Sequence, residues 1–198
     1  DAFGAAGVEV RFVGGVVRDA LARRPIADVD LATPAPPERT LDLLQRAGLK
    51  TLDVGRAHGT ITALVDGRAI EITTLRRDVE TDGRHAVVAF TDDWRADAER
   101  RDFTINAMSA DRSGRVYDYF GGFEDLTAGR VRFVGDADSR VREDYLRILR
   151  FFRFHAWYGV GAPDAPAGTA SPRFRRNGCA PNCCGCSRRP TRRPRSRR

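Results

Sequence analysis

Two carboxylates separated by one residue, Asp28 and Asp30, are the side chains in this sequence best suited to chemistry. Residues 27–32 alternate polar and apolar residues and are predicted to form a strand, so both carboxylates point to one face. Neighbouring carboxylates repel each other unless a cation lies between them. Oxygen ligands of this kind suit Mg²⁺, which binds one or two carboxylates together with substrate phosphates. The pair therefore predicts a magnesium site; the alternative is one aspartate that caps a turn and one that is solvated.

A glycine turn precedes this pair. Residues 8–13 alternate like a half-buried strand, Gly14 and Gly15 end that strand, and residues 16–24 have the apolar spacing of a short helix. Backbone N–H groups at a glycine turn and a helix start bind anions, and Arg18 on the first helical turn would add a phosphate contact. The spacing is not that of a dinucleotide-binding glycine fingerprint. The stretch therefore predicts phosphate and metal binding at one place.

Two further stretches could add charge to such a site. Glu71 lies between isoleucines in a predicted strand, either as a solvated residue or as a third carboxylate that completes a two-metal site. Residues 100–107 read RRDFTINA, in which Asp102 or Thr104 could also be only a helix cap. Both stretches are open to either interpretation when taken alone.

The last charged stretch, residues 142–153, reads REDYLRILRFFR. Asp144 and Arg147 are three residues apart, and Arg147, Arg150 and Arg153 repeat at the same interval, so they follow one face of a helix. On an isolated helix these residues would form a solvated face with local ion pairs. Alternatively, an aspartate and an arginine side by side can pair with the Watson–Crick edge of a base while the other arginines hold phosphates.

The net charge of +7 does not describe the body of the chain. Ten arginines and no acidic residue lie between Arg173 and Arg198, whereas residues 1–160 hold 24 basic and 26 acidic residues. Net charge is therefore no evidence that the body binds nucleic acid. The body has no cysteine, which fits a reducing cytoplasm, and neither a signal peptide nor a membrane-spanning apolar run is present. We expect a cytoplasmic location and no membrane partner.

Residues 161–198 are rich in Pro, Gly, Arg and Cys and lack an apolar period, so we expect disorder there. Their cysteine spacing, C-x3-C-C-x-C, is not that of a zinc finger. The composition is what a shifted reading frame in a GC-rich gene would give. The chain begins at Asp1 and its only methionine is Met108, so we expect a fragment whose start lies upstream.

The remaining periodicity predicts the elements that position these residues. Helices are expected over residues 38–47, 96–110 and 138–158, and strands over 51–54, 60–65, 69–75, 86–90, 116–119 and 131–134. Most of residues 76–97 are expected to form a mobile loop. The longest helix is expected to bury Val141, Tyr145, Ile148, Leu149 and Phe152.

Taken together and in this order, the four charged stretches resemble the catalytic head of the class II nucleotidyltransferases. That family comprises CCA-adding tRNA nucleotidyltransferases, their CC- and A-adding relatives, and bacterial poly(A) polymerases. The resemblance covers about residues 8–158 and implies an α+β fold: a polymerase-β-like head with a mixed sheet and flanking helices, leading into the start of a helical neck. It implies a head over residues 1–135 and the start of the neck over 136–160, with 161–198 outside it. In that family the neck continues into body and tail domains that hold the RNA, whereas the resemblance here stops near Tyr158.

The resemblance also implies a role for each site residue. Asp28 and Asp30 match the catalytic ligands of Mg²⁺, and Glu71 matches a third catalytic carboxylate. The implied nucleotide-binding residues are Gly14, Gly15, Arg18, Arg101, Asp102, Asn106, Glu143, Asp144, Arg147, Arg150 and Arg153. Among these, Asp144 and Arg147 match the pair that selects C or A, and Glu143 would steady them. Residues 81–97 resemble the loop that switches from C to A addition.

The implied function is template-independent transfer of C and A nucleotides from CTP and ATP to the 3′ end of tRNA by two-metal phosphoryl transfer. Two alternatives stay open. One is a bacterial poly(A) polymerase, which shares the head motifs, and the other is a truncated head that binds nucleotide without transferring it.

Overall fold

The computed structural model describes residues 2–52, 55–82 and 85–163. Its main sheet has seven strands in the order β3-β4-β5-β2-β1-β8-β9. Their bounds are β1 (Arg11–Val13), β2 (Asp30–Thr33), β3 (Lys50–Leu52), β4 (Thr60–Val65), β5 (Arg68–Thr74), β8 (Ser109–Ala110) and β9 (Val116–Tyr117). β2 and β5 pair in parallel and every other neighbouring pair is antiparallel. The predicted α+β fold with a mixed sheet is therefore confirmed.

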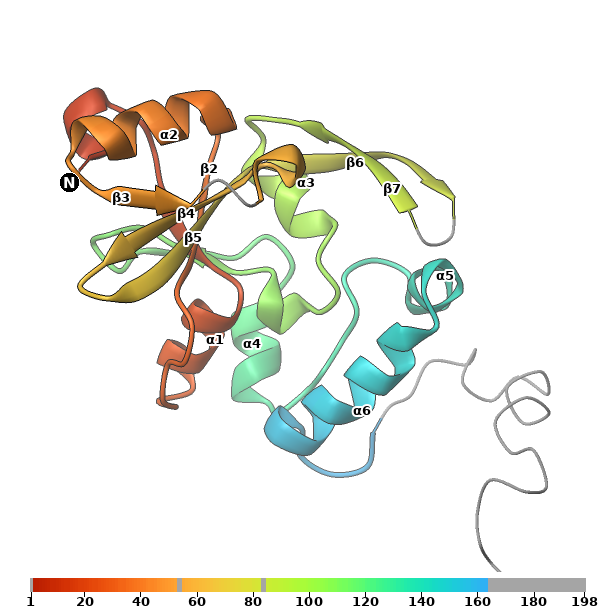
Figure 1. Cartoon of the computed structure of the whole chain (residues 1–198). Helices are drawn as coiled ribbons and strands as arrows, with labels where there is room; N and C mark the ends of the chain where they lie inside the picture. Colours follow the sequence, from red (N-terminus) through yellow and green to blue (C-terminus); the bar gives the residue numbers. More distant parts are fainter. Residues whose placement is uncertain (1, 53–54, 83–84, 164–198) are drawn as a thin grey trace, which may run out of the picture.

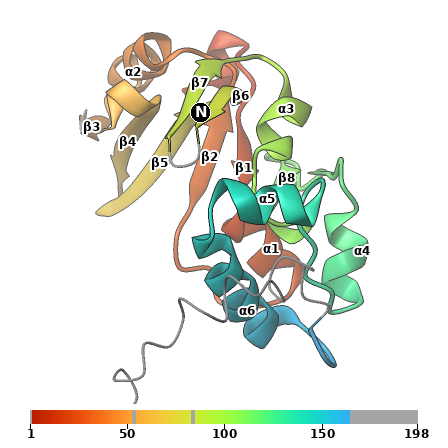
Figure 2. The same cartoon turned by 90° about the vertical axis from the view of Figure 1, so that its right-hand side faces the viewer.

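Six α-helices flank this sheet within the described residues: α1 (Gly15–Leu21), α2 (Pro37–Arg46), α3 (Trp94–Glu99), α4 (Gly122–Thr127), α5 (Ala137–Glu143) and α6 (Leu146–Tyr158). Single 3₁₀ turns lie at Gly4–Ala6, Arg56–His58 and Thr104–Asn106. α2 and α6 lie at opposite ends of the molecule (Figures 1 and 2). Over the described part of the chain, every helix is too short or too polar to cross a membrane.

The strands predicted over residues 60–65 and 69–75 are confirmed as β4 and β5, which form a hairpin. Asp66 and Gly67, which connect the strands, both have positive φ, 50° and 77°, as a two-residue hairpin turn requires. The hairpin's inward side chains Ile61 and Ile72 are buried against Leu44 of α2. This cluster fixes the strand that carries Glu71.

Two expectations about residues 76–110 are wrong. Most of the predicted mobile loop is an antiparallel hairpin of β6 (Arg76–Asp82) and β7 (His85–Phe90), which forms a separate two-stranded sheet. Strand β6 was missed because its RRDVETD sequence shows no apolar alternation, whereas ladder hydrogen bonds need only backbone. The predicted helix over 96–110 stops at Glu99, because Phe103 is extended and bridges to Phe133. That bridge is all that forms of the strand predicted over 131–134.

Two successive glycines, Gly121 and Gly122, lie at the start of α4. Gly121 has a φ of 75°, and Gly122 lies so close to the 3₁₀ turn that a Cβ there would come within 2.2 Å of the Thr104 carbonyl oxygen. Glycine is therefore required for α4 to pack beside the Thr104–Asn106 turn.

The predicted long helix over 138–158 is two helices, because Asp144 is extended at φ −152° and ψ 110°. Its carboxylate accepts a hydrogen bond from the Leu146 backbone N–H at 2.9 Å and so opens α6. The break shifts the helical phase: Val141 and Ile148 are buried as predicted, but Phe151 is buried in place of the exposed Phe152. Tyr145 and Leu149, also predicted to be buried, are exposed.

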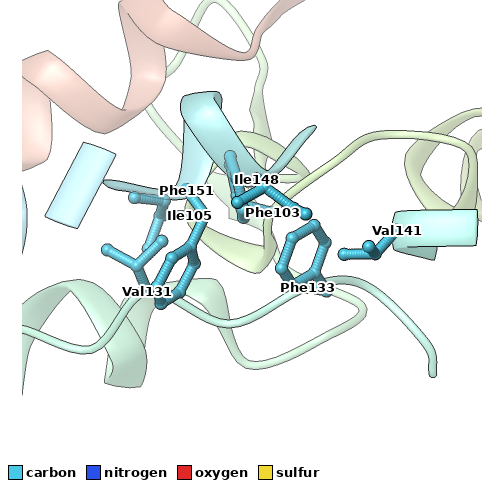
Figure 3. Packing of buried hydrophobic residues seen from close by; sticks show 7 residues of the cluster. All are labelled: Phe103, Ile105, Val131, Phe133, Val141, Ile148 and Phe151. Atoms are coloured by element: carbon cyan, nitrogen blue, oxygen red, sulfur yellow. The ribbon is translucent and has the colours of Figure 1, made fainter. Parts of the chain in front are cut away.

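A hydrophobic cluster holds α5 and α6 against the rest of the chain (Figure 3). Its members are Phe103, Ile105, Val131, Phe133, Val141, Ile148 and Phe151. The rings of Phe133 and Phe151 stack with centroids 5.9 Å apart. The cluster crosses the predicted boundary between head and neck at residue 135, so α6 is anchored to the head by a shared core.

Candidate active site

An open cavity of about 520 Å³ lies where the glycine turn, the start of β2, the Arg100–Asn106 segment and α6 converge. It is lined by Gly14, Gly15, Arg18, Asp30, Arg100, Arg101, Asp102, Asn106, Asp144, Arg147, Arg150 and Phe154. Five of these residues are arginines and three are aspartates, so positive charge is in excess. An excess of fixed cations in a concave site favours a polyanionic ligand such as a triphosphate.

The acidic part of the cavity is Asp30, the first residue of β2. The parallel register pairs Asp30 with Glu71 on β5, so the two residues are direct neighbours across the ladder. Asp28 lies before the strand, which begins later than predicted, and is exposed. Desolvation, and to a lesser extent repulsion from Asp28, raise the pKa of Asp30 above its usual 3.8, while Arg101 opposes the shift. A bound cation would relieve this cost, so the donor set fits Mg²⁺.

Within the described residues, no three Asp, Glu, His or Cys side chains converge closely enough to hold an ion. Neither Asp28 nor Glu71 lines the cavity. The three predicted catalytic carboxylates thus lie near one another but do not converge on a single ion-binding point. The catalytic role of Glu71 stays a prediction.

The glycine turn lets an arginine lie directly over the backbone. Gly14 has a φ of 70°, and a Cβ at this position would come within 2.9 Å of Arg101 Nη1. Arg101 is held there by Asp97, a buried carboxylate 3.2 Å from its Nη2. Any other residue in place of Gly14 would be strained at this φ, and the guanidinium end of Arg101 would have to shift to make room for its Cβ.

A continuous chain of hydrogen bonds crosses the floor of the cavity. Arg18 donates through Nε and Nη2 to Asp19, at 2.9 Å each, and through Nη1 to Asn106 Oδ1 at 2.5 Å. Asn106 Nδ2 donates to Asp102 Oδ1 at 3.0 Å. Asp102 Oδ2 accepts from Arg150 Nε at 2.8 Å. Four predicted nucleotide-binding residues are therefore held by one network that joins α1, the 3₁₀ turn and α6.

The far end of this network lies outside the cavity. The Tyr158 hydroxyl donates to Asp19 Oδ1 at 2.5 Å, and the Tyr158 and Phe154 rings lie 4.5 and 5.1 Å from the Arg18 guanidinium. Burial by itself raises the pKa of Asp19, but hydrogen bonds from Arg18 and Tyr158 outweigh it and hold that pKa below 3.8. Asp19 and Tyr158 therefore orient Arg18.

This pKa predicts how stability depends on pH. Because the pKa of Asp19 is lower in the folded chain than in the unfolded chain, its stabilisation is fully present above 3.8 and is lost as the pH falls below that value. We expect Asp19→Asn to lower the free energy of unfolding by about 1–2 kcal/mol at pH 7. Urea unfolding at pH 7 and at pH 3 should show the difference from the wild type narrowing at the lower pH.

Asp42→Asn is the matched control, because Asp42 is half-exposed and pairs with Arg46 on the surface of α2. It should change stability by less than about 0.5 kcal/mol at either pH. An Asp19→Asn deficit of equal size at both pH values would contradict the ion-pair account of Asp19.

The residues predicted to select the base lie at the junction of α5 and α6. Asp144 and Arg147 both line the cavity, although they no longer share a helix. Glu143 lies behind them and accepts hydrogen bonds from Arg147 at 2.5 Å and from Arg140 at 3.0 Å. Glu143 therefore supports Arg147 without lining the cavity.

Arg153 is not brought to this cavity. It lines a second cavity of about 250 Å³ with Arg18, Asp19, Phe154, Trp157 and Tyr158. On α6 it lies three residues beyond Arg150, the arginine that pairs with Asp102. The predicted contact of Arg153 with the nucleotide in the first cavity has no support from this placement.

Sequence analysis missed Arg100 and Phe154 in the lining, and Arg140 behind it. Arg100 directly precedes Arg101, and Arg140 lies three residues before Glu143 and seven before Arg147. That spacing would place them on one helical face, and it is the only sequence signal for Arg140. Phe154 reads as an ordinary core residue.

Known proteins resemble this chain in sequence and fold. The family described as the Poly A polymerase head domain matches residues 10–132. The mitochondrial CCA tRNA nucleotidyltransferase 1 of Danio rerio is 55% identical over 148 residues, which are 74% of this chain and 34% of that protein. The chain therefore spans about a third of the length of this relative.

Solved structures agree. The Bacillus stearothermophilus CCA-adding enzyme in complex with CTP has a TM-score of 0.69 and 42% identity, covering 77% of this chain and 36% of the enzyme. A tRNA nucleotidyltransferase complexed with a primer tRNA and an incoming ATP analog has a TM-score of 0.62 and 31% identity, covering 76% of this chain and 42% of that one. The chain belongs to the Poly A polymerase head-domain family, the catalytic head of the class II nucleotidyltransferases.

Proposed function

We propose that this chain is the head of a CCA-adding tRNA nucleotidyltransferase, which transfers C and A nucleotides from CTP and ATP to the 3′ end of tRNA. The observation that carries the proposal is the cavity itself, which brings Asp30, the glycine turn and Arg101 together with Asp144 and Arg147. The first group of residues has the chemistry to hold a metal-bound triphosphate, and Asp144 and Arg147 have the chemistry to hold the edge of a base. The relatives with this head are named for CCA addition or tRNA nucleotidyl transfer.

In this proposal Asp28 and Asp30 hold Mg²⁺, which when bound supplies a Lewis acid that activates the RNA hydroxyl and neutralises the triphosphate. Arg18 and Arg101, with the N–H groups that follow Gly14, orient the phosphates. The 3′ oxygen of the RNA forms a bond to the α-phosphorus, the bond to pyrophosphate breaks, and the hydroxyl proton passes to solvent. The protein supplies position and charge, so no covalent intermediate is needed.

Base choice in this proposal belongs to Asp144 and Arg147. A carboxylate accepts and a guanidinium donates, so together they match a base edge that presents both a donor and an acceptor. Arg150, paired with Asp102, also lines the cavity. A location in the cytoplasm stays a prediction.

The test offers α-labelled CTP and ATP, singly and together, with Mg²⁺ and a tRNA that lacks its 3′ CCA. Incorporation of C followed by a single A is the expected result. ATP alone giving a long A tract would instead indicate a poly(A) polymerase, the alternative favoured by the description of the matching family. Nucleotide binding without incorporation would contradict transfer by this chain and support the binding-only alternative.

A further inference from the structure

Arg140, on α5, is a partly buried arginine that does not line the cavity; its side chain is 11% exposed. Its guanidinium nevertheless reaches two separate parts of the cavity wall. A buried arginine that makes several hydrogen bonds to backbone is costly to place and has few interchangeable partners. The groups to which Arg140 is hydrogen-bonded therefore indicate its role.

The first attachment is to the end of α3. Arg140 Nη2 donates to the carbonyl oxygens of Arg100 at 2.7 Å and Arg101 at 2.6 Å. α3 ends at Glu99, so these carbonyls directly follow its last turn and carry the negative end of its dipole. A cation here fixes the backbone that immediately precedes Asp102.

The second attachment is to Arg147. Arg140 Nη1 donates to Glu143 Oε2 at 3.0 Å, and Arg147 Nη1 donates to the same oxygen at 2.5 Å. Arg147 Nη1 also donates to the Arg140 carbonyl oxygen at 3.0 Å. Arg140 thus holds Arg147 twice, through its own backbone and through the shared carboxylate.

From these contacts, and resting on the proposed function, we propose that Arg140 is a positioning residue for base selection. It fixes the guanidinium plane of Arg147 relative to the Arg100–Asp102 segment. The residues that contact the base edge and those that contact the phosphates are thereby held in fixed positions relative to each other. It touches neither ligand itself. Only the planar guanidinium of an arginine can donate to both carbonyls and to the carboxylate at once, because the ammonium of a lysine is a point charge on a flexible stem.

One atom supports a role beyond packing. Arg140 Nε is buried and has no hydrogen-bond partner. An unsatisfied buried donor costs stability, so the two Nη atoms reach their partners at the expense of the third nitrogen. A residue that served stability alone would gain from a geometry that satisfied all of its donors.

The test uses the whole chain and two readouts. Dissociation constants for CTP, ATP, GTP and UTP are measured with Mg²⁺ for the wild type, Arg140→Gln, Arg140→Lys and Arg142→Gln. Arg142 is an exposed arginine of the same helix and provides the matched control. The second readout is the Nε–Hε NMR resonance of Arg147 without nucleotide, identified by its loss in Arg147→Lys. Thermal unfolding establishes that each variant is folded at the temperature used.

Arg140→Gln is expected to reduce the preference for CTP and ATP over GTP and UTP by about tenfold, equivalent to one lost charge-assisted hydrogen bond. Arg140→Lys should restore part of the preference, because it returns the cation to the end of α3. The Arg147 resonance should move in both Arg140 variants and stay in place in Arg142→Gln.

Two affinity results would overturn the inference: a folded Arg140→Gln chain whose preference stays within about twofold of the wild type, or an equal loss of affinity for all four nucleotides. An Arg147 resonance unmoved by Arg140→Gln would overturn it as well. A wild-type chain with no preference for CTP and ATP would instead overturn the proposed function, and the inference with it. The wild-type measurement therefore distinguishes the two failures.

Discussion

Asp30→Asn is expected to lower nucleotide transfer by at least ~1,000-fold while leaving the fold intact, because metal-assisted stabilisation of several kcal/mol corresponds to about three powers of ten in rate. The substitution should not destabilise the folded chain. Desolvation and repulsion from Asp28 raise the pKa of Asp30, so ionisation of this carboxyl lowers the stability of the folded chain. Removing the charge is therefore expected to leave the thermal midpoint unchanged or slightly higher. Labelled-nucleotide incorporation and thermal unfolding on the same samples check both parts.

Asp66→Asn is the matched control for this substitution. Asp66 is an exposed carboxylate in the turn between β4 and β5, with a φ of 50° that asparagine tolerates. It should leave transfer and the thermal midpoint unchanged. Binding of CTP should also depend on Mg²⁺ in the wild type and in Asp66→Asn, but not in Asp30→Asn. Transfer by Asp30→Asn within tenfold of the wild type would show that Asp30 does not hold the metal.

Phe151→Ala is expected to have the largest effect on stability, about 3–5 kcal/mol. Phe151 is 1% exposed and its ring lies 6.4 Å from Phe103 and 5.9 Å from Phe133, so its removal leaves a cavity within the cluster shown in Figure 3. The loss is a large fraction of the 5–15 kcal/mol that stabilises an ordinary domain. It should also loosen α6, which carries Arg147 and Arg150. Urea unfolding measures the change in the free energy of unfolding.

The adjacent Phe152→Ala is the control, since Phe152 is 44% exposed and should cost less than about 1 kcal/mol. The pair also tests the helical phase. A continuous helix over 138–158 would bury Phe152, whereas the break at Asp144 buries Phe151. If Phe152→Ala proved the more destabilising substitution, the division into α5 and α6 would be contradicted.

The elements that sequence patterns predicted well are those whose signal lies in contiguous residues. The β4–β5 hairpin is specified by apolar alternation on both sides of Asp66 and Gly67, and α2 by a single apolar stripe. The patterns failed where a distant contact overrides the local period. Phe103 leaves the helical conformation to reach Phe133, and β6 is a strand because β7 pairs with it.

The site divides in the same way. The sequence by itself identified most of the cavity lining, since Gly14, Asp30 and Arg147 each lie in a short stretch whose residue types suit phosphate, metal or base. Only the tertiary structure decided that Asp30 lies beside Glu71, that Arg153 turns to another cavity, and that Arg140 joins α3 to Arg147. Residue types and short spacings determine which chemistry is possible within a stretch. Which stretches meet, and at which angle, is determined by packing between residues far apart in the chain, and no short spacing records it.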